Sequence, residues 1–235
     1  MKSFLGLILL LSFALSASAQ TKHTRSEIVE HFCHAQEVTS GPEFDRIESI
    51  RQRLSPILTR FPAIEIHTAV VDSNVINAWA NNLNSRTALI CIPTGIVSFM
   101  GEAEGEMAFI YAHELGHALD DSCKTTTGRA QVAPPSIRGE LDKLLGGDGR
   151  IGSVEQRACE TRADEIGFRL FTAAGYNPFD AAGGFGRLEM LSGDTSTGIL
   201  GRLAAMGRDH PITPDRIRHM RALLIQSMER QGERP

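Results

Sequence analysis

The sequence predicts an α+β domain that is mainly helical and carries a small antiparallel β-sheet. Several long segments place apolar residues at three- and four-residue steps, which is the period of an amphipathic helix. Residues 64–92 instead alternate apolar and polar side chains, as strands do. The chain has 235 residues, 42% of them hydrophobic, which is enough to bury one core. A single domain is therefore expected over residues 20–235.

The first 19 residues have the pattern of a secretory signal peptide. Lys2 precedes an apolar run over residues 4–15, and the small residues 17–19 follow it. An uncleaved membrane anchor is the alternative, but a span needs about 20 apolar residues and this run is shorter. Cleavage near Ala19 predicts an exported protein, periplasmic or secreted, without a transmembrane segment in its mature form.

The expected elements follow in order after this segment. A helical pattern runs from Thr24 to Phe61, and Pro62 ends it. Strands are expected at residues 64–71, 77–81 and 87–92, with turn residues at 81–85. Three short strands in succession are the basis for predicting a small antiparallel sheet.

Helices return after Gly101, where acidic residues suit the start of a helix. Further helices are expected over 154–174, after Pro178, and from Thr213-Pro214, a cap followed by a proline in the first turn. A polar connection at 121–152, with one short helix near 137–145, and a flexible stretch at 192–207 separate them. The sequence leaves open whether residues 121–152 cover the site as a lid.

Charge argues against a nucleic-acid partner. The 28 acidic and 24 basic residues are interspersed, and the formal net charge is -4. No basic stripe or acidic tail is present that would favour nucleic acid or anionic lipid.

The four cysteines are Cys33, Cys91, Cys123 and Cys159. In an exported chain an even number favours one or two disulfides, with three possible complete pairings. The alternative is buried free thiols, and none of the spacings is that of a structural zinc knuckle.

The pattern His113-Glu114-x-x-His117 predicts a zinc site on the helix that follows Gly101. Residues four apart share one helix face, so both imidazoles can bind one ion while Glu114 lies beside it. Zinc lowers the pKa of a bound water to about 7, and a neighbouring carboxylate can accept its proton. The alternative is two surface histidines that are four apart by chance.

A catalytic zinc needs a third protein ligand and one open position. Downstream candidates are Glu140, Glu155, Glu160 and Glu165. No histidine occurs between His117 and His210, which excludes the compact three-histidine arrangement of metzincins.

Glu160 is favoured because Asp164 lies four residues later, on a face that also carries Ala163 and Gly167. These small residues would allow close approach to the metal helix, and Asp164 could accept a hydrogen bond from a ligand histidine. Taken alone, Glu160 and Asp164 would be read as a solvated helix face. The histidine pair reverses that preference.

Five segments together resemble a known enzyme family. They are NAWA at 77–80, PTGIVSF at 93–99, EMAFIYAHELGHALD at 106–120, ETRADEIGFRLFTAAGYNP at 160–178 and DHPITPDRI at 209–217. The ordered set is similar to the zinc metallopeptidase family of HtpX, the type 1 CAAX prenyl proteases and the exported proteases BepA and LoiP. The resemblance implies a zincin-like protease domain that binds one Zn²⁺ per chain.

The resemblance also implies roles for residues outside the metal motif. Asn77, Ala78 and Trp79 match a segment that edges the active-site cleft, where an extended substrate would add to the sheet. His210 matches a catalytic residue that stabilises the oxyanion, and Arg216 matches an arginine that supports the site. From the sequence alone these two would be a loop histidine and a charge on a helix face.

The chain departs from the family in two respects. Residues 81–86 replace the usual glycine-rich turn, which puts the shape of the cleft rim in doubt. The helical membrane segments of HtpX and the prenyl proteases are absent from this sequence, so prenylated substrates are not implied.

Two functions remain after these observations. The first is a zinc endopeptidase of the bacterial envelope that cleaves unfolded or misassembled polypeptides, with Glu114 as general base and then acid. The second is an exported chaperone or assembly factor that binds clients in the same cleft with little or no proteolysis. A closed metal site would favour the second, and His210 or a cysteine near the cleft could supply the fourth ligand that closes it. Cys159 is a poor candidate, because it points away from the helix face that carries Glu160.

Overall fold

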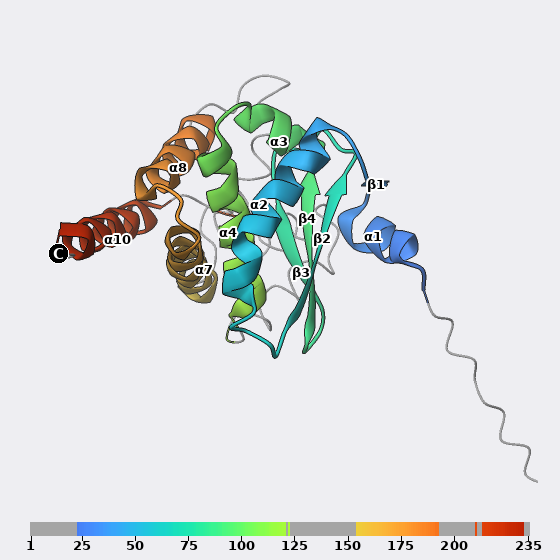
Figure 1. Cartoon of the computed structure of the whole chain (residues 1–235), viewed down its shortest axis with the longest axis horizontal. Helices are drawn as coiled ribbons and strands as arrows, with labels where there is room; N and C mark the ends of the chain where they lie inside the picture. The colour runs from blue at the N-terminus through green and yellow to red at the C-terminus, as the bar shows by residue number, and fades with distance from the viewer. Residues whose placement is uncertain (1–22, 121, 123–153, 193–209, 211–212, 233–235) are drawn as a thin grey trace, which may run out of the picture.

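The structure is a computed structural model that describes residues 23–120, 122, 154–192, 210 and 213–232. The predicted signal peptide at 1–19, the short helix near 137–145 and the connections at 123–152 and 193–207 lie outside the described residues. The elements are α1 (Arg25–Cys33), β1 (Glu37–Val38), α2 (Pro42–Leu58), β2 (Glu65–Val71), β3 (Trp79–Asn84), β4 (Thr87–Pro93), α3 (Thr94–Met100), α4 (Glu104–Leu119), α7 (Val154–Ala173), α8 (Pro178–Ser192) and α10 (Pro214–Gly232) (Figure 1). The predicted α+β class with a mainly helical content is confirmed.

The sheet has four strands in the order β1-β2-β4-β3. The outer pairs, β1 with β2 and β3 with β4, are antiparallel as expected, but the central pair β2 and β4 is parallel. The expectation of a wholly antiparallel sheet was therefore wrong. Strand direction alternates from β2 to β3 to β4, so β4 runs parallel to β2, and β4 lies between β2 and β3. Its residues 88–93 are all buried, as is usual for a strand in parallel pairing.

Two predicted boundaries also moved. The single helical pattern from Thr24 to Phe61 is two helices separated by β1, because α1 ends at His34 with positive φ and α2 begins at Pro42 after Gly41. The turn expected at 81–85 is shorter and lies at residues 85–86. The asparagines before it belong to β3, and the last of them, Asn84, accepts a hydrogen bond from the Arg86 backbone at 2.8 Å.

Helix α4 is the centre of the molecule. Every residue from Met107 to Ala118 is buried, which is the pattern of a helix enclosed on all sides. The sheet with α2 and α3 lies on one side of α4, and α7 and α8 lie on the other (Figure 1). Any polar side chain on this stretch of α4 therefore needs a buried partner.

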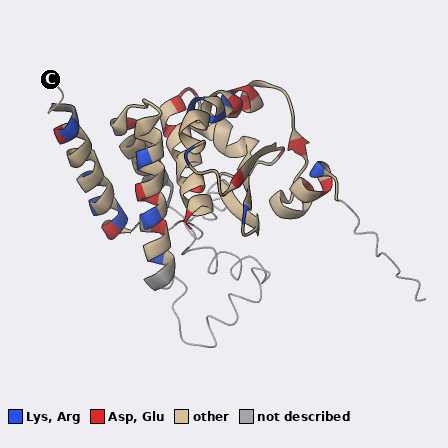
Figure 2. Cartoon of the chain, turned by 60° about the horizontal axis from the view of Figure 1, so that its bottom comes forward, with Lys and Arg blue, Asp and Glu red and all other residues tan. Residues whose placement is uncertain are grey.

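The surface carries both signs of charge. Acidic and basic residues both occur along α2, α7 and α10 (Figure 2). Among the helices that the structure describes, none combines the length and the hydropathy needed to span a bilayer.

Candidate metal centre

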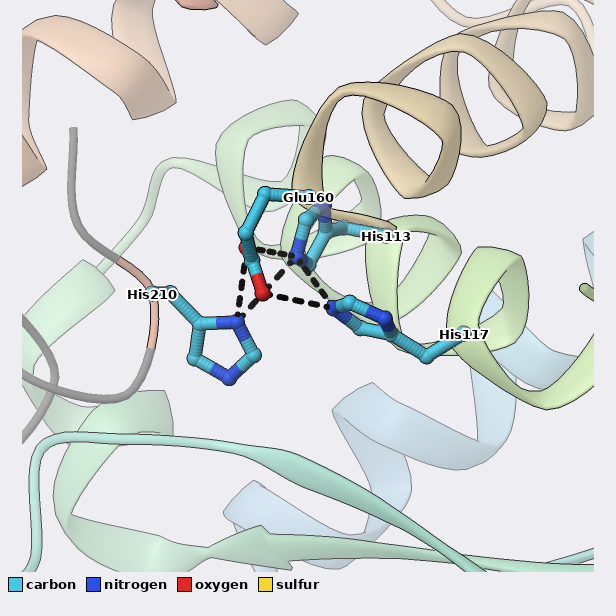
Figure 3. Close-up of side chains that lie close together, drawn as sticks. All are labelled: His113, His117, Glu160 and His210. Carbon is cyan, nitrogen blue, oxygen red and sulfur yellow. Dashed lines mark hydrogen bonds and ion pairs between the residues drawn. The ribbon is translucent and has the colours of Figure 1, made fainter. Parts of the chain in front are cut away.

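Helices α4 and α7 approach closely because small residues face each other along their contact. A Cβ built on Gly116 of α4 would lie 2.5 Å from the carbonyl oxygen of Ala163, and one built on Gly167 of α7 would lie 2.8 Å from the carbonyl oxygen of Ala112. Neither position has room for a side chain. This contact brings the carboxylate of Glu160 on α7 over the histidines of α4, as the spacing predicted (Figure 3).

Four side chains from three parts of the chain converge at this point. The Nε2 atoms of His113 and His117 are 3.1 Å apart. Glu160 lies 3.4 Å from each of them, through Oε2 to His113 and Oε1 to His117. Nδ1 of His210 is 3.1 Å from Oε2 of Glu160 and 3.4 Å from Nε2 of His113. Figure 3 shows the four side chains pointing toward one another.

These spacings fit the ligand set of a small divalent ion. A tetrahedral zinc with bonds of about 2.0–2.1 Å holds its ligand atoms about 3.3–3.4 Å apart. The five measured separations run from 3.1 to 3.4 Å, and one donor atom of each residue lies within 4.8 Å of all the others. Three imidazoles and one carboxylate are the nitrogen and oxygen donors that zinc accepts.

A second group of charges supports the first. Nδ1 of His113 lies 2.9 Å from Oδ1 of Asp164, which is fully buried. Arg216 on α10 donates to both Asp164 oxygens at 2.7 Å, and its Nη1 lies 3.1 Å from Oε2 of Glu160. Arg216 therefore bridges the carboxylates of Glu160 and Asp164, the first of which belongs to the four converging side chains and the second of which orients His113.

Burial and these contacts act in opposite directions on the pKa of each group. Burial lowers the pKa of His113, but Asp164 and Glu160 outweigh it and raise the pKa to about 10 in the metal-free chain. Burial raises the pKa of Glu160, but His210 and His117 outweigh it and hold the pKa well below its usual value. Burial likewise raises the pKa of Asp164, and Arg216 more than reverses that effect. The site favours ionised carboxylates next to positive charge.

Glu114 lies beside the four donors and is 2% exposed. Its Oε1 is 3.7 Å from Nε2 of His210, and its Oε2 has no hydrogen-bond partner among the described residues. A buried carboxylate oxygen without a partner is costly unless another molecule uses it. Glu114 thus has a free acceptor next to the predicted metal site.

In the predicted substrate-binding segment, the side chains are buried or hydrogen-bonded within the protein. Asn77 and Ala78 are buried, and the indole N–H of Trp79 donates to the carbonyl of Phe32 at 3.3 Å. Trp79 packs on the α1 side of the sheet, whereas Ala78 belongs to the core that contains α4. A substrate beside this segment would be read through main-chain groups rather than through these side chains.

Residues 42–136 match the model of peptidase family M48. The M48 match includes α2 to α4 and the His113-Glu114-x-x-His117 motif. It ends before Glu160, Asp164, His210 and Arg216, so the convergence of these later residues on α4 is a separate observation. No curated protein matches the chain. The M48 match and the four-residue cluster together support a metallopeptidase with a metal-binding site.

Sequence reasoning did not anticipate a second connection between α4 and α7. Arg162 donates to Asp120, directly after α4, at 2.7 Å. Asp120 Oδ1 also accepts from the hydroxyl of Ser122 at 2.6 Å. The sequence features that could have indicated this contact are an acidic residue at the end of the motif helix and an arginine two residues after Glu160.

Proposed function

We propose that this protein is a zinc-dependent endopeptidase that is exported after cleavage near Ala19 and acts in the bacterial envelope. The observation that carries the proposal is the buried convergence of His113, His117 and Glu160, with Glu114 beside them and its Oε2 unpaired among the described residues. The M48 match supports the metallopeptidase class. The likeness to the HtpX, BepA and LoiP group rests on the ordered motifs of the sequence.

Each residue has a distinct task in the proposed reaction. His113, His117 and Glu160 would hold the zinc, which when bound supplies a Lewis acid that acidifies water and polarises a peptide carbonyl. Glu114 takes the proton of the attacking water on its carboxylate and delivers it to the leaving amine nitrogen. Asp164 would keep His113 in the tautomer whose Nε2 faces the centre, because its Oδ1 lies 2.9 Å from Nδ1 of that ring.

His210 would stabilise the oxyanion of the tetrahedral intermediate through a ring N–H. Its Nε2 lies on the Glu114 side of the site, 3.7 Å from that carboxylate. Burial lowers the pKa of His210, but Glu160 and Glu114 outweigh it and raise the pKa, which favours the protonated donor form in the metal-free chain.

The proposed substrates are extended polypeptides, either unfolded or misassembled, as in protein quality control. β3 lies at one edge of the sheet, and it contacts α4, which carries His113 and His117. An extended chain could pair with an exposed strand edge, which recognises backbone more than side chains. Main-chain groups near Asn77, Ala78 and Trp79 would make that contact.

One observation favours the second candidate, a chaperone or assembly factor with a closed site. Nδ1 of His210 stands among the donors at the separation of a fourth ligand. A metal ion with four protein ligands has no position for water and would be structural. The two functions therefore differ in what His210 does.

Metal content and cleavage of unfolded casein by the mature protein test the proposal. One zinc per chain, with cleavage by the wild type and none by Glu114→Gln, supports the peptidase. His210→Ala should lower cleavage about 10²–10³-fold if this residue stabilises the oxyanion. A gain of cleavage in His210→Ala would instead show that His210 closes the site. If the protein binds zinc but neither the wild type nor Glu114→Gln cleaves casein, the binding protein is favoured. A chain without zinc would contradict both proposed functions.

A further inference from the structure

Two side chains of edge strand β3 are hydrogen-bonded to the same carbonyl group of α1. The carbonyl oxygen of Phe32 accepts from Nε1 of Trp79 at 3.3 Å and from Nδ2 of Asn81 at 3.2 Å. Phe32 is in the last turn of α1, where backbone carbonyl groups accept no hydrogen bond from within the helix. Two side chains of β3 thus fill both acceptor positions of a carbonyl that the helix leaves open.

A disulfide fixes this carbonyl to the neighbouring strand. Cys33 follows Phe32 and is bonded to Cys91 of β4. In the sheet register, Cys91 is the Cα partner of Trp79. The first residue of β3 is therefore held twice, by strand pairing to Cys91 and by its indole to the residue next to Cys33. We call Phe32, Trp79, Asn81 and the Cys33–Cys91 disulfide the β3 clamp.

The clamp also explains a buried amide on an apolar face. Asn81 is 4% exposed, and it lies over the small core that α1 forms with the sheet. A buried amide is unfavourable unless it is hydrogen-bonded. Asn81 Nδ2 donates to Phe32 and lies 3.4 Å from Sγ of Cys91, so its position depends on α1 and on the disulfide.

Helix α1 is short, so the covalent bond adds to its hold on the sheet. It has nine residues, and isolated helices of this length are marginal in water. Its buried apolar side chains are Val29 and Cys33. A polar anchor lies at its opposite end, where Arg25 pairs with Glu37 and donates to the carbonyl of Thr68.

We infer that the β3 clamp positions the edge strand for polypeptide binding. This inference rests on the proposed function, because it assigns β3 as the substrate strand. An edge strand has a sheet partner on one side only, so contacts on its face must help to hold it if its free edge is to present a straight set of backbone groups. Breaking the clamp should weaken polypeptide binding without removing the zinc.

The test compares variants of the zinc-loaded mature protein in the Glu114→Gln background, which removes cleavage as a complication. Cys33→Ser with Cys91→Ser breaks the disulfide, and Trp79→Phe with Asn81→Leu removes the two donors at similar volume. Arg25→Ala is the matched control, because it releases the other end of α1.

Amide exchange over residues 79–84 and affinity for unfolded casein are the two measurements. Both clamp variants should exchange about tenfold faster over this strand, because the strand then opens locally, and should bind casein about tenfold more weakly. The control should change neither by more than about twofold, and zinc content should stay the same in all variants.

Equal exchange in clamp variants and wild type would overturn the inference. So would faster exchange of the same size in Arg25→Ala, which would show a general loss of α1, or faster exchange with unchanged casein affinity. If the chain without the Glu114 substitution cleaves nothing, the peptidase proposal fails, while the clamp is still judged by exchange and binding.

Discussion

Asp164→Asn should uncouple the charges that support the metal site while preserving side-chain shape. Asp164 is fully buried and accepts two hydrogen bonds from Arg216, each at 2.7 Å. It also lies 2.9 Å from Nδ1 of His113. The substitution removes the negative charge and places an amide group where three donors converge. At least one contact is then donor against donor, whichever way the amide turns.

The expected cost follows from what remains around Arg216. Removing one partner of a buried ion pair costs about 3–5 kcal/mol, because the other charge stays buried without compensation. Glu160 remains 3.1 Å from Nη1 of Arg216, so the lower end of that range, about 3 kcal/mol, is expected. Loss of a carboxylate that orients a metal-binding histidine reduces metal affinity about 10–100-fold.

Urea unfolding and zinc competition against a fluorescent chelator measure the two effects. Asp215→Asn is the control, because Asp215 has 71% side-chain exposure and pairs with Arg218 at the surface. A surface pair of this kind contributes about 0–1 kcal/mol, and its loss should leave zinc affinity unchanged. The reasoning is refuted if Asp164→Asn binds zinc within about threefold of the wild type.

Three further predictions concern pH, the disulfide and helix packing. Burial lowers the pKa of His113, but its carboxylate neighbours raise it to about 10 from an ordinary 6.5. Its contribution is thus complete below pH 6.5 and is lost as pH rises through 10, so the metal-free chain should unfold at lower urea at pH 9.5 than at about pH 6.5. Cys33→Ser with Cys91→Ser, which opens a 58-residue separation, should cost about 4 kcal/mol in urea unfolding. Gly167→Ala should destabilise by about 1–3 kcal/mol through overpacking, whereas Gly186→Ala, with no atom within 4 Å of the new Cβ, should stabilise slightly in thermal melts.

The sequence predicted those parts of the structure that local interactions decide. The helix carrying His113 and His117 was predictable from acidic residues at its start and apolar spacing along it. The end of α7 was predictable because Gly175, with φ of 78°, and the proline that follows cannot continue a helix. Glu160 was predictable because the small residues on its face allowed close contact with α4.

Long-range features were not predictable in the same way. The parallel pairing of β2 with β4 depends on where β3 is placed in the sheet. Alternation of apolar and polar residues along a strand does not say which other strand lies next to it. Asn81 is of a residue type common in turns, but it lies in a strand, where its side chain donates to the Phe32 carbonyl. The Cys33–Cys91 disulfide is one of the pairings that the number of cysteines left open. Cys159 is also disulfide-bonded.

The charges of the buried centre indicate why a divalent ion suits it. Glu114, Glu160 and Asp164 carry three formal negative charges and Arg216 carries one positive charge, and each of the four is at most 4% exposed. A buried net charge of minus two is unfavourable by several kcal/mol unless it is compensated. In the metal-free chain the histidines can compensate, because the carboxylates around His113 and His210 outweigh burial and raise the pKa of both.

Zinc would supply the same two positive charges and would bind histidines only in their neutral form. Zinc binding near pH 7 should therefore release protons, up to about two per ion, and zinc affinity should rise with pH. Calorimetric titration in two buffers of different ionisation enthalpy counts the protons released. Release of none would mean that the metal-free centre balances its charge without protonated histidines. Release of one or two would mean that protons occupy the place of the metal until it binds.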